Sequence, residues 1–289
     1  MSDYFTTEEL ADFLRIKSRK VYDLVSKDLV PHSRVMGKLL FSKIEISNWI
    51  SGNKSEDIQL KSIPIVLLGS HDPLLELAVK KSKSGIAMSF DGSTQGLERF
   101  KLNEGFVSGL HLYDNDENIW NIPIVKKQLS DKAVVLIEWA KRERGLIFKE
   151  NNNIKNISIE NYKGKRLVRR QIGSGSEIYL QYILRTYNLS HDDFKRTEIA
   201  YSENDAVHLV LSDKADVTLG LKSEAKKYQL GFCPIITERF DLVVDRKFWF
   251  EKPFQDLLNF CKTSHFKEIA SNLDGYNIID LGKVHFNSN

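Results

Sequence analysis

Four short loops rich in glycine and hydroxyl side chains are the part of the chain best suited to binding chemistry. Each follows an apolar run and opens a segment with helical spacing; their sequences are GSHDP (69–73), DGST (91–94), GSGS (173–176) and SEND (202–205). The amino end of a helix presents unpaired N–H groups and a partial positive charge, and nearby hydroxyls add neutral donors. Brought together, such loops could hold an anion without many charged side chains.

A second group of residues could contact nucleic acid. Between Arg15 and Lys43 the chain has eight Lys or Arg against two acidic residues, a net charge of +6, whereas the whole chain carries only +3. Clustered cations on one amphipathic helix and a neighbouring hairpin suit phosphate and base contacts. The residues expected to contact DNA are Lys17, Ser18, Arg19, Lys20, Tyr22, Arg34 and Lys38. The alternative is a small helical module for protein interaction whose charges are simply solvated.

The motifs of common enzyme classes are not found in the sequence. It contains no P-loop lysine, no nucleophile with an adjacent base, no metal-ligand spacing and no Gly-x-Gly-x-x-Gly run. We therefore expect neither an enzyme nor a bound cofactor. An enzyme that binds a phosphate ester or another anion on the same fold is the alternative, because the GSGS and GST loops could also cradle a phosphate.

The elements that must position the basic residues lie in the first 52 residues. A capping box at Thr6 and Glu9 predicts a helix over about Thr7–Leu14, and a tight turn leads to a second helix capped by Ser18. A small hairpin around Gly37 and a third helix follow. This order predicts a winged helix-turn-helix DNA-binding domain over residues 1–52, and the polar stretch 53–62 predicts a linker.

Residues 63–289 alternate between strand and helix patterns, which predicts an α/β domain. The hydroxyl-rich loops fall at the carboxyl ends of predicted strands, where open α/β sheets bind ligands. Further short strands are expected at Val134–Glu138, Leu146–Phe148, Asp216–Leu219 and Leu242–Val244.

Composition is that of an ordinary globular protein, with 42% hydrophobic and 28% charged residues among 289. The N-terminus has no apolar stretch typical of an export signal, and no apolar run approaches the ~20 residues that span a bilayer. We expect a cytoplasmic protein without a membrane partner, whose two cysteines are buried thiols. An exported solute-binding protein would need an export signal and would have no use for a helix-turn-helix.

Two resemblances sharpen these expectations. The segment from Tyr4 to Ile50, especially FTTEELADFLRIKSRKVYDLV and KIEISNWI, resembles the excisionase-type helix-turn-helix family. The segment from Ile63 to Arg246 resembles the periplasmic-binding-protein-like domains of molybdate- and tungstate-type regulators. The matching phrases are GSHDP, DGSTQGL, GLHLYD, WNIP, RERGLIF, RRQIGSGS, KADVTLGL and ERFDLVV.

The second resemblance implies a two-lobed type II periplasmic-binding-protein-like domain with the ligand between its lobes. Lobe 1 would comprise about residues 63–144 and 238–289, and lobe 2 about residues 145–237. With the fourth loop included, the expected ligand residues are Ser70, Ser93, Thr94, His111, Arg170, Ser174, Ser176 and Ser202.

Some of these assignments have a structural alternative, and the chain departs from the family at three positions. His111 could be a half-buried histidine with a protein partner, and Arg170 could pair with Glu177 or another structural carboxylate. Arg169, Glu177 and Arg144 stand where the family usually has Asn, Arg and Gln, which changes the charge of the cleft and leaves the identity of the anion open.

Together these features predict a ligand-responsive transcriptional regulator. Its expected partners are a double-stranded DNA operator, a second copy of the chain in a homodimer, and a small anionic effector. The resemblance favours an oxyanion such as molybdate or tungstate, and a small organic anion is the alternative.

Overall fold

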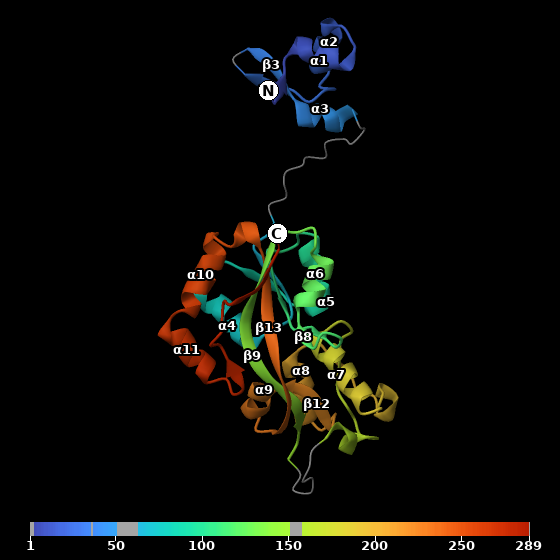
Figure 1. Ribbon diagram of the computed structural model, residues 1–289, viewed down its shortest axis with the longest axis vertical. Helices are drawn as coiled ribbons and strands as arrows, with labels where there is room; N and C mark the ends of the chain where they lie inside the picture. The colour runs from blue at the N-terminus through green and yellow to red at the C-terminus, as the bar shows by residue number, and fades with distance from the viewer. Residues whose placement is uncertain (1–2, 36, 51–62, 151–157, 289) are drawn as a thin grey trace. The chain divides into compact units, whose positions relative to one another are not determined.

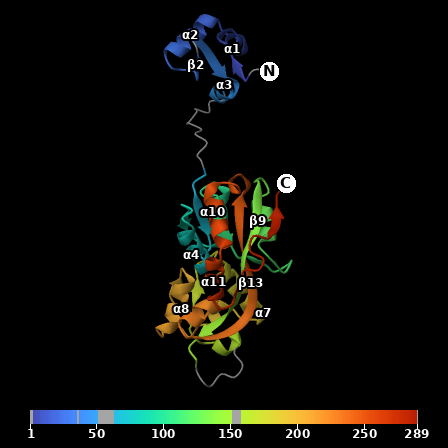
Figure 2. The same ribbon diagram turned by 90° about the vertical axis from the view of Figure 1, so that its left-hand side faces the viewer.

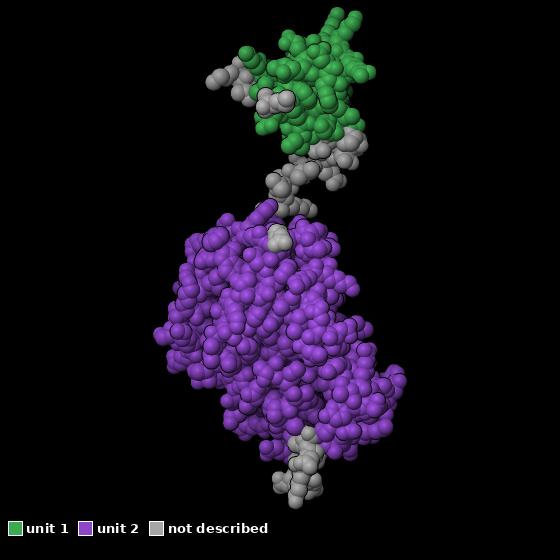
Figure 3. Space-filling model, viewed as in Figure 1, with its two compact units in different colours: residues 1–62 green, residues 63–289 purple. Residues whose placement is uncertain are grey.

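The structure, a computed structural model, describes residues 3–35, 37–50, 63–150 and 158–288. Contacts within the chain define two units, residues 1–62 and residues 63–289 (Figure 3). The linker expected at 53–62 lies outside the described residues. Each unit has a hydrophobic core of its own.

Unit 1 consists of three helices and a small antiparallel sheet. Its elements are β1 (Tyr4–Phe5), α1 (Thr7–Leu14), α2 (Ser18–Ser26), β2 (Ser33–Val35), β3 (Lys38–Ser42) and α3 (Lys43–Ile50). The strand order is β1-β3-β2, so β2 and β3 form the predicted hairpin next to α1 and α2. The predicted helix-turn-helix is confirmed.

Local sequence explains where α1 begins. Thr6 Oγ1 accepts a hydrogen bond from the Glu9 backbone N–H at 3.3 Å, and Glu9 Oε2 accepts one from the Thr6 N–H at 2.7 Å. The cap predicted for α2 is wrong: Ser18 is its first helical residue, and Lys17 occupies the N-cap position without a side-chain cap. Packing of Val21 into the core therefore orients α2, without help from a capping bond.

Unit 2 is a mixed α/β domain, as predicted. Its helices are α4 (Pro73–Ser82), α5 (Ser93–Lys101), α6 (Ile122–Gln128), α7 (Gly175–Thr186), α8 (Glu203–Leu211), α9 (Lys222–Lys227), α10 (Lys252–Cys261) and α11 (Ser264–Ser271). Its strands are β4 (Val66–Gly69), β5 (Ala87–Ser89), β6 (Val107–Leu110), β7 (Tyr113–Asp114), β8 (Ile119–Trp120), β9 (Val134–Phe148), β10 (Arg169–Arg170), β11 (Ile199–Ala200), β12 (Val217–Leu221), β13 (Gly231–Asp245), β14 (Tyr276–Asn277) and β15 (Val284–Asn287). Short 3-10 turns lie at Ile159–Tyr162, His191–Asp193 and Arg246–Phe248.

The main sheet has the strand order β12-β9-β13-β6-β4-β5, and β14 and β15 also pair with β9. Helices α4, α10 and α11 lie on one side of the two long strands, and α5 and α6 lie on the other (Figure 1). We use lobe 1 and lobe 2 for the two parts proposed from the sequence. Trp139, Phe240 and Phe254 belong to a core cluster of lobe 1, whereas Tyr179, Leu180 and Val217 belong to one of lobe 2.

Strands β9 and β13 are much longer than the sequence pattern predicted. The short strands expected at Val134–Glu138 and Leu146–Phe148 are the two ends of β9, and Leu242–Val244 is only the end of β13. The two strands pair antiparallel from Gly231↔Phe148 to Asp245↔Val134 and run through both lobes (Figure 2). The prediction failed because charged residues interrupt the apolar pattern at 141–144, yet Arg142 and Arg144 are buried there.

Candidate ligand cleft and candidate nucleic-acid interface

The four hydroxyl-rich loops each lead from a strand into a helix. They connect β4 to α4, β5 to α5, β10 to α7 and β11 to α8. At the first of them Asp72 caps α4, because its Oδ1 accepts the Leu75 backbone N–H at 2.7 Å, and Pro73 occupies the first turn. The loops thus place four helix amino ends in unit 2.

Residues of all four loops surround one cavity of about 200 Å³. Its lining residues are Ser70, His71, Phe90, Gly92, His111, Arg170, Gln171, Ser174, Ser176, Tyr201, Ser202 and Glu203. Six of the eight residues expected to bind ligand are among them. The other two do not line it: Ser93 is buried against Ser70, and the Thr94 backbone N–H donates to the Gly173 carbonyl.

Ser93 is fully buried and supports the residues in front of it. Its Oγ lies 2.6 Å from Ser70 Oγ and accepts a hydrogen bond from the His111 backbone N–H at 3.2 Å. The Ser70–Ser93 pair leaves one hydroxyl hydrogen to be donated elsewhere, since two hydroxyls share a single bond between them. Because Ser70 lines the cavity and Ser93 does not, Ser70 is the member of this pair that a ligand could reach.

The serines of lobe 2 are helix caps as well as lining residues. Ser174 Oγ accepts the Glu177 N–H at 3.2 Å at the start of α7, and Ser202 Oγ accepts the Asp205 N–H at 3.0 Å at the start of α8. An accepting hydroxyl keeps its own hydrogen, which can point toward an anion. Ser176 differs, because its Oγ donates to Glu203 Oε1 at 3.0 Å.

A chain of buried ion pairs runs beneath the cavity. Arg142 pairs with Asp72 at 2.7 Å and with Glu238, and Arg144 pairs with Glu238 at 2.7 Å. Glu203 then pairs with Arg144 at 2.9 Å and with Arg170 at 3.0 Å. Three carboxylates face three guanidinium groups, so these side chains add no net charge to the cleft.

These contacts determine the protonation of the groups involved. Burial raises the pKa of Glu203, but Arg144 and Arg170 lower it more, and the net pKa lies below the ordinary value. Burial also raises the pKa of Glu238, but Arg142 and Arg144 lower it more, so its pKa lies well below the ordinary value. Burial lowers the pKa of His111, although Glu238 acts against it. Both carboxylates are thus ionised at neutral pH, and His111 is neutral.

The structural alternatives for His111 and Arg170 hold in part. His111 lines the cavity, and its Nδ1 lies 3.0 Å from Glu238 Oε2, so it is a satisfied buried histidine that also faces the cleft. The Arg170 side chain pairs with Glu203, and its Nε donates to the Ala200 carbonyl at 3.1 Å. Glu177 instead accepts the Arg170 backbone N–H at 2.9 Å and pairs with Arg169 at 3.0 Å.

The two walls of the cleft touch at the loops that precede α5 and α7. The Thr94 N–H donates to the Gly173 carbonyl at 3.2 Å. A Cβ on Gly175 would lie 2.4 Å from the His111 carbonyl oxygen, so only glycine allows this approach. Gly173 has a φ of 83°, a region that favours glycine. The GSGS sequence therefore serves close contact between the lobes in addition to any ligand.

Six lining residues were not among the predicted ligand residues: His71, Phe90, Gly92, Gln171, Tyr201 and Glu203. His71 and Gly92 belong to two of the predicted loops. Glu203 sits in the SEND loop and could only be recognised from its partners, which lie far away in the sequence at Arg144 and Arg170. Phe90, Gln171 and Tyr201 each adjoin a predicted loop, but nothing in their spacing indicates a cavity. Within the described residues, no group of three or more His, Cys, Asp or Glu side chains could hold a metal ion.

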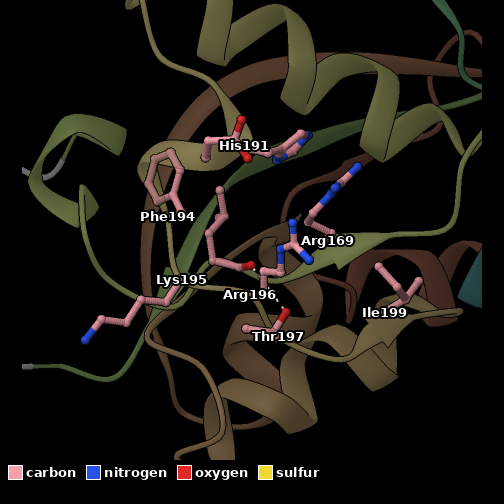
Figure 4. A pocket seen from close by; sticks show the side chains of 9 residues that line it. Arg169, His191, Phe194, Lys195, Arg196, Thr197 and Ile199 are labelled. Carbon is pink, nitrogen blue, oxygen red and sulfur yellow. Dashed lines mark hydrogen bonds between the residues drawn. The ribbon is translucent and has the colours of Figure 1, made fainter.

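A separate hollow of about 340 Å³ lies within lobe 2 (Figure 4). Arg169, His191 and Arg196 line it, whereas Figure 4 shows the Lys195 side chain extending away from them. Arg169 is already paired there with the buried carboxylate of Glu177. The hydroxyl donors and helix amino ends described above are gathered around the cleft and not around this hollow.

In unit 1, most of the predicted DNA-contact residues lie on two adjoining surfaces. Lys17, Arg19, Lys20 and Tyr22 line a shallow surface along α2. Tyr22 also lines a groove of about 590 Å³ that includes Arg34 and Lys38 of the hairpin. Ser18 lines neither surface. Helix α2 and the β2–β3 hairpin thus present their cations next to a shared tyrosine, which is 55% exposed.

The cations on α2 differ in their partners. Lys20 and Lys27 both pair with Asp23, each at 3.0 Å, so part of their charge is compensated on the helix itself. No ion-pair partner is found for Arg19 among the described residues. Arg19 is therefore the cation of α2 most available to a phosphate.

In the described part of the chain, no helix has the length and apolar character needed to cross a membrane.

Comparison with known proteins agrees with this division. Residues 4–54 match a helix-turn-helix domain family, and residues 74–262 match the PBP superfamily domain. The chain is 26% identical over 301 residues to "Uncharacterized protein YvgK" of Bacillus subtilis (strain 168), with 97% of each chain covered.

A solved structure has a similar fold. It is a putative phosphate ABC transporter substrate-binding protein with bound phosphate from Clostridium perfringens, 14% identical, with a TM-score of 0.51. The match covers 76% of this chain and 98% of that one. An N-terminal helix-turn-helix combined with such a domain is the composition of a ligand-binding, DNA-binding regulator. By its match over 74–262, the chain belongs to the PBP superfamily.

Proposed function

We propose that this protein is a transcriptional regulator whose large domain senses a small anion in the cleft between its lobes. The observation that carries the proposal is the gathering of four helix amino ends and several serine hydroxyls around one cavity whose charged side chains cancel. Such a site offers neutral hydrogen-bond donors to an anion. Helix dipoles and backbone N–H groups stabilise the bound anion, so no further cationic side chain is needed.

We propose that the group bound in the cleft is an oxyanion, either free, as in molybdate or tungstate, or carried by a small organic molecule. Ser174 and Ser202 keep hydroxyl hydrogens that an anion could accept, and the Ser70–Ser93 pair has one further hydrogen. The similar fold that contains bound phosphate supports an oxyanion in a cleft of this type. Arg170 adds a guanidinium edge, although Glu203 already compensates its charge.

For unit 1 we propose that α2 enters the major groove of an operator while the hairpin contacts the backbone. Lys17, Arg19, Lys20 and Tyr22 would supply the helix contacts, with Ser18 at the helix start, and Arg34 and Lys38 those of the hairpin. A homodimer reading two half-sites is expected, because one module of this size supplies little affinity alone. The regulator would act in the cytoplasm, where the DNA is.

A thermal-shift panel tests the sensing proposal. The full chain is heated with molybdate, tungstate, sulfate and phosphate, and with chloride as the control. A ligand that binds only the folded state raises the melting temperature by mass action, by about 2.7 kcal/mol at one hundred times its dissociation constant. At least one oxyanion should raise the melting temperature at millimolar concentration. If none of them, and no organic anion, has an effect, the large domain does not sense an anion.

A further inference from the structure

The cleft does not end at the serine-lined cavity. A second hollow of about 600 Å³ adjoins it, and Phe90, Arg170, Gln171 and Tyr201 line both. We call this second hollow the annex. Its other lining residues are Asp91, Gln95, Arg169, Ile172 and Ile199. A molecule with its head in the serine cavity could therefore continue into the annex without crossing protein.

The annex is bordered by large apolar side chains that are open to solvent. Ile172 is 86% exposed, Tyr201 is 70% exposed and Ile199 is 42% exposed. Single exposed apolar residues are common, but three of them beside a binding cavity are typical of a surface that a bound ligand covers. No described part of the chain covers Ile172.

The two hollows also differ in what they offer a ligand. The smaller one, about 200 Å³, has the serine hydroxyls and helix amino ends that suit an acidic group. The annex adds the aliphatic surface of Ile172 and Ile199 to the aromatic side chains of Phe90 and Tyr201, which line both hollows. A bare tetrahedral oxyanion would use only the first, whereas pockets of roughly 300–1,000 Å³ typically hold organic ligands.

Building on the proposed function, we infer that the effector is an organic anion and not a bare oxyanion. Its acidic group lies in the serine cavity, and its aromatic or aliphatic body lies in the annex against Ile172, Ile199 and Tyr201. The body adds affinity by removing these side chains from water, and the acidic group orients the molecule between the two lobes. The annex is thus the part of the cleft that selects among anions with the same head group.

Calorimetry on the full chain with matched pairs of probes tests this inference. Each pair consists of a small acid and a phenyl compound with the same acid group: phosphate and phenyl phosphate, methanesulfonate and benzenesulfonate, acetate and benzoate. At about pH 8 both phosphates carry close to two negative charges, so charge does not differ within that pair. In at least one pair the phenyl compound should bind about tenfold tighter or more, because the ring buries apolar surface.

Two variants locate the effect. Ile172→Asn replaces apolar surface of the annex by a neutral amide and should remove the preference for the phenyl compound while leaving the affinity for the simple anion within about twofold. Ile279→Asn is the matched control, since Ile279 is 87% exposed and lines neither hollow. It should leave both affinities unchanged.

The outcomes separate this inference from the proposed function. If a simple anion binds as tightly as its phenyl partner in every pair that binds, the organic-anion inference is overturned and anion sensing stands. A phenyl preference that survives Ile172→Asn also overturns it, because the ring would then lie elsewhere. If no member of any pair binds, and molybdate and tungstate do not bind either, the proposed function itself is contradicted.

Discussion

Ser174 has two roles in the cleft, and comparison with Thr263 separates them. Both residues are helix caps: Ser174 Oγ accepts the Glu177 N–H, and Thr263 Oγ1 accepts the Phe266 N–H at 3.2 Å. Replacing either by alanine should cost about 1 kcal/mol of folding free energy. Only Ser174→Ala should also weaken the effector, by about ten- to a hundredfold, because one hydrogen bond to a charged partner is lost.

Urea unfolding and calorimetry on the two variants make the comparison. If both variants lose the same stability but only Ser174→Ala binds the effector more weakly, the Ser174 hydroxyl is supported as a ligand contact. Unchanged affinity in Ser174→Ala would remove this hydroxyl from the site.

Glu203 is expected to control how stability depends on pH. Its pKa is lowered in the folded state, against the raising effect of burial, by Arg144 and Arg170. A carboxylate with a lowered folded pKa stabilises the protein above its unfolded pKa, near 4.5, and this stabilisation is lost as the pH falls further. Glu203→Gln should therefore cost about 3–5 kcal/mol at pH 7, because it leaves buried guanidinium groups uncompensated. The difference from the natural chain should shrink in acid.

Glu224→Gln is the control for this experiment. Glu224 is also buried, but burial raises its pKa above the ordinary value, so its ionised form is not favoured by folding. Its replacement should change stability at pH 7 by less than about 1 kcal/mol. Urea midpoints between pH 3 and pH 7 measure both variants. A Glu203→Gln variant as stable as Glu224→Gln at pH 7 would show that the ion-pair chain is not important for stability.

At the residue scale, the hydroxyls of the cleft could be predicted and the charges could not. Ser70, Ser174 and Ser202 stand in loops whose local pattern indicates a helix start. The counter-charges come from residues that are distant in the sequence, such as Glu203 and Glu238 opposite Arg144. Sequence spacing carries no information on such pairs. The sequence therefore could not show that the arginines and carboxylates near the cleft neutralise one another.

Among the elements, α2 allows a direct test of DNA contact. Arg19→Ala should weaken binding to an operator duplex selected from random sequences more than Lys20→Ala does, because Asp23 already compensates Lys20. If Arg19 neutralises one phosphate, the slope of log affinity against log salt should fall by about 0.9 in magnitude. Fluorescence anisotropy across a salt series measures both effects, and Lys101→Ala in unit 2 is the control. Loss of affinity without a change in slope would indicate that Arg19 does not contact phosphate.

Helix α7 provides a test of lobe closure. A methyl group on Gly175 would collide with the His111 carbonyl, so Gly175→Ala should hold the lobes apart. Effector affinity should then fall at least tenfold, because donors from both lobes can no longer reach one ligand. Gly164→Ala is the control, since a Cβ there meets nothing within 4 Å and reports only the cost of its φ of 76°. Equal effector affinity in the two variants would contradict a role for close lobe contact.

The long strands show where element prediction from sequence reaches its limit. The short apolar ends of β9 were recognised, but Arg142 and Arg144 between them gave the pattern of an exposed connection. In the structure their charges are paired, which lets a charged segment continue a buried strand. Caps depend on local sequence: the predicted cap at Thr6 acts on Glu9, three positions away, and is found, whereas the cap predicted at Ser18 is not.

At the scale of the whole molecule, the proposal requires a coupling between two units. Residues 15–43 carry +6 while the chain as a whole carries +3, so the positive charge that DNA would meet is concentrated on α2 and the hairpin. A ligand can change DNA binding only if its affinity differs between the DNA-bound and the free protein. Any such effect is reciprocal, and for regulators of this kind it amounts to about 1–3 kcal/mol.

The most direct test is the dissociation constant of the full chain for its operator duplex, measured with and without a saturating concentration of the anion that raises the melting temperature. We predict that the anion changes this constant by a factor of about 5 to 150 in either direction, and that operator DNA changes the affinity for the anion by the same factor. Identical constants with and without the anion, while both ligands still bind, would contradict the claim that the large domain regulates the DNA-binding one.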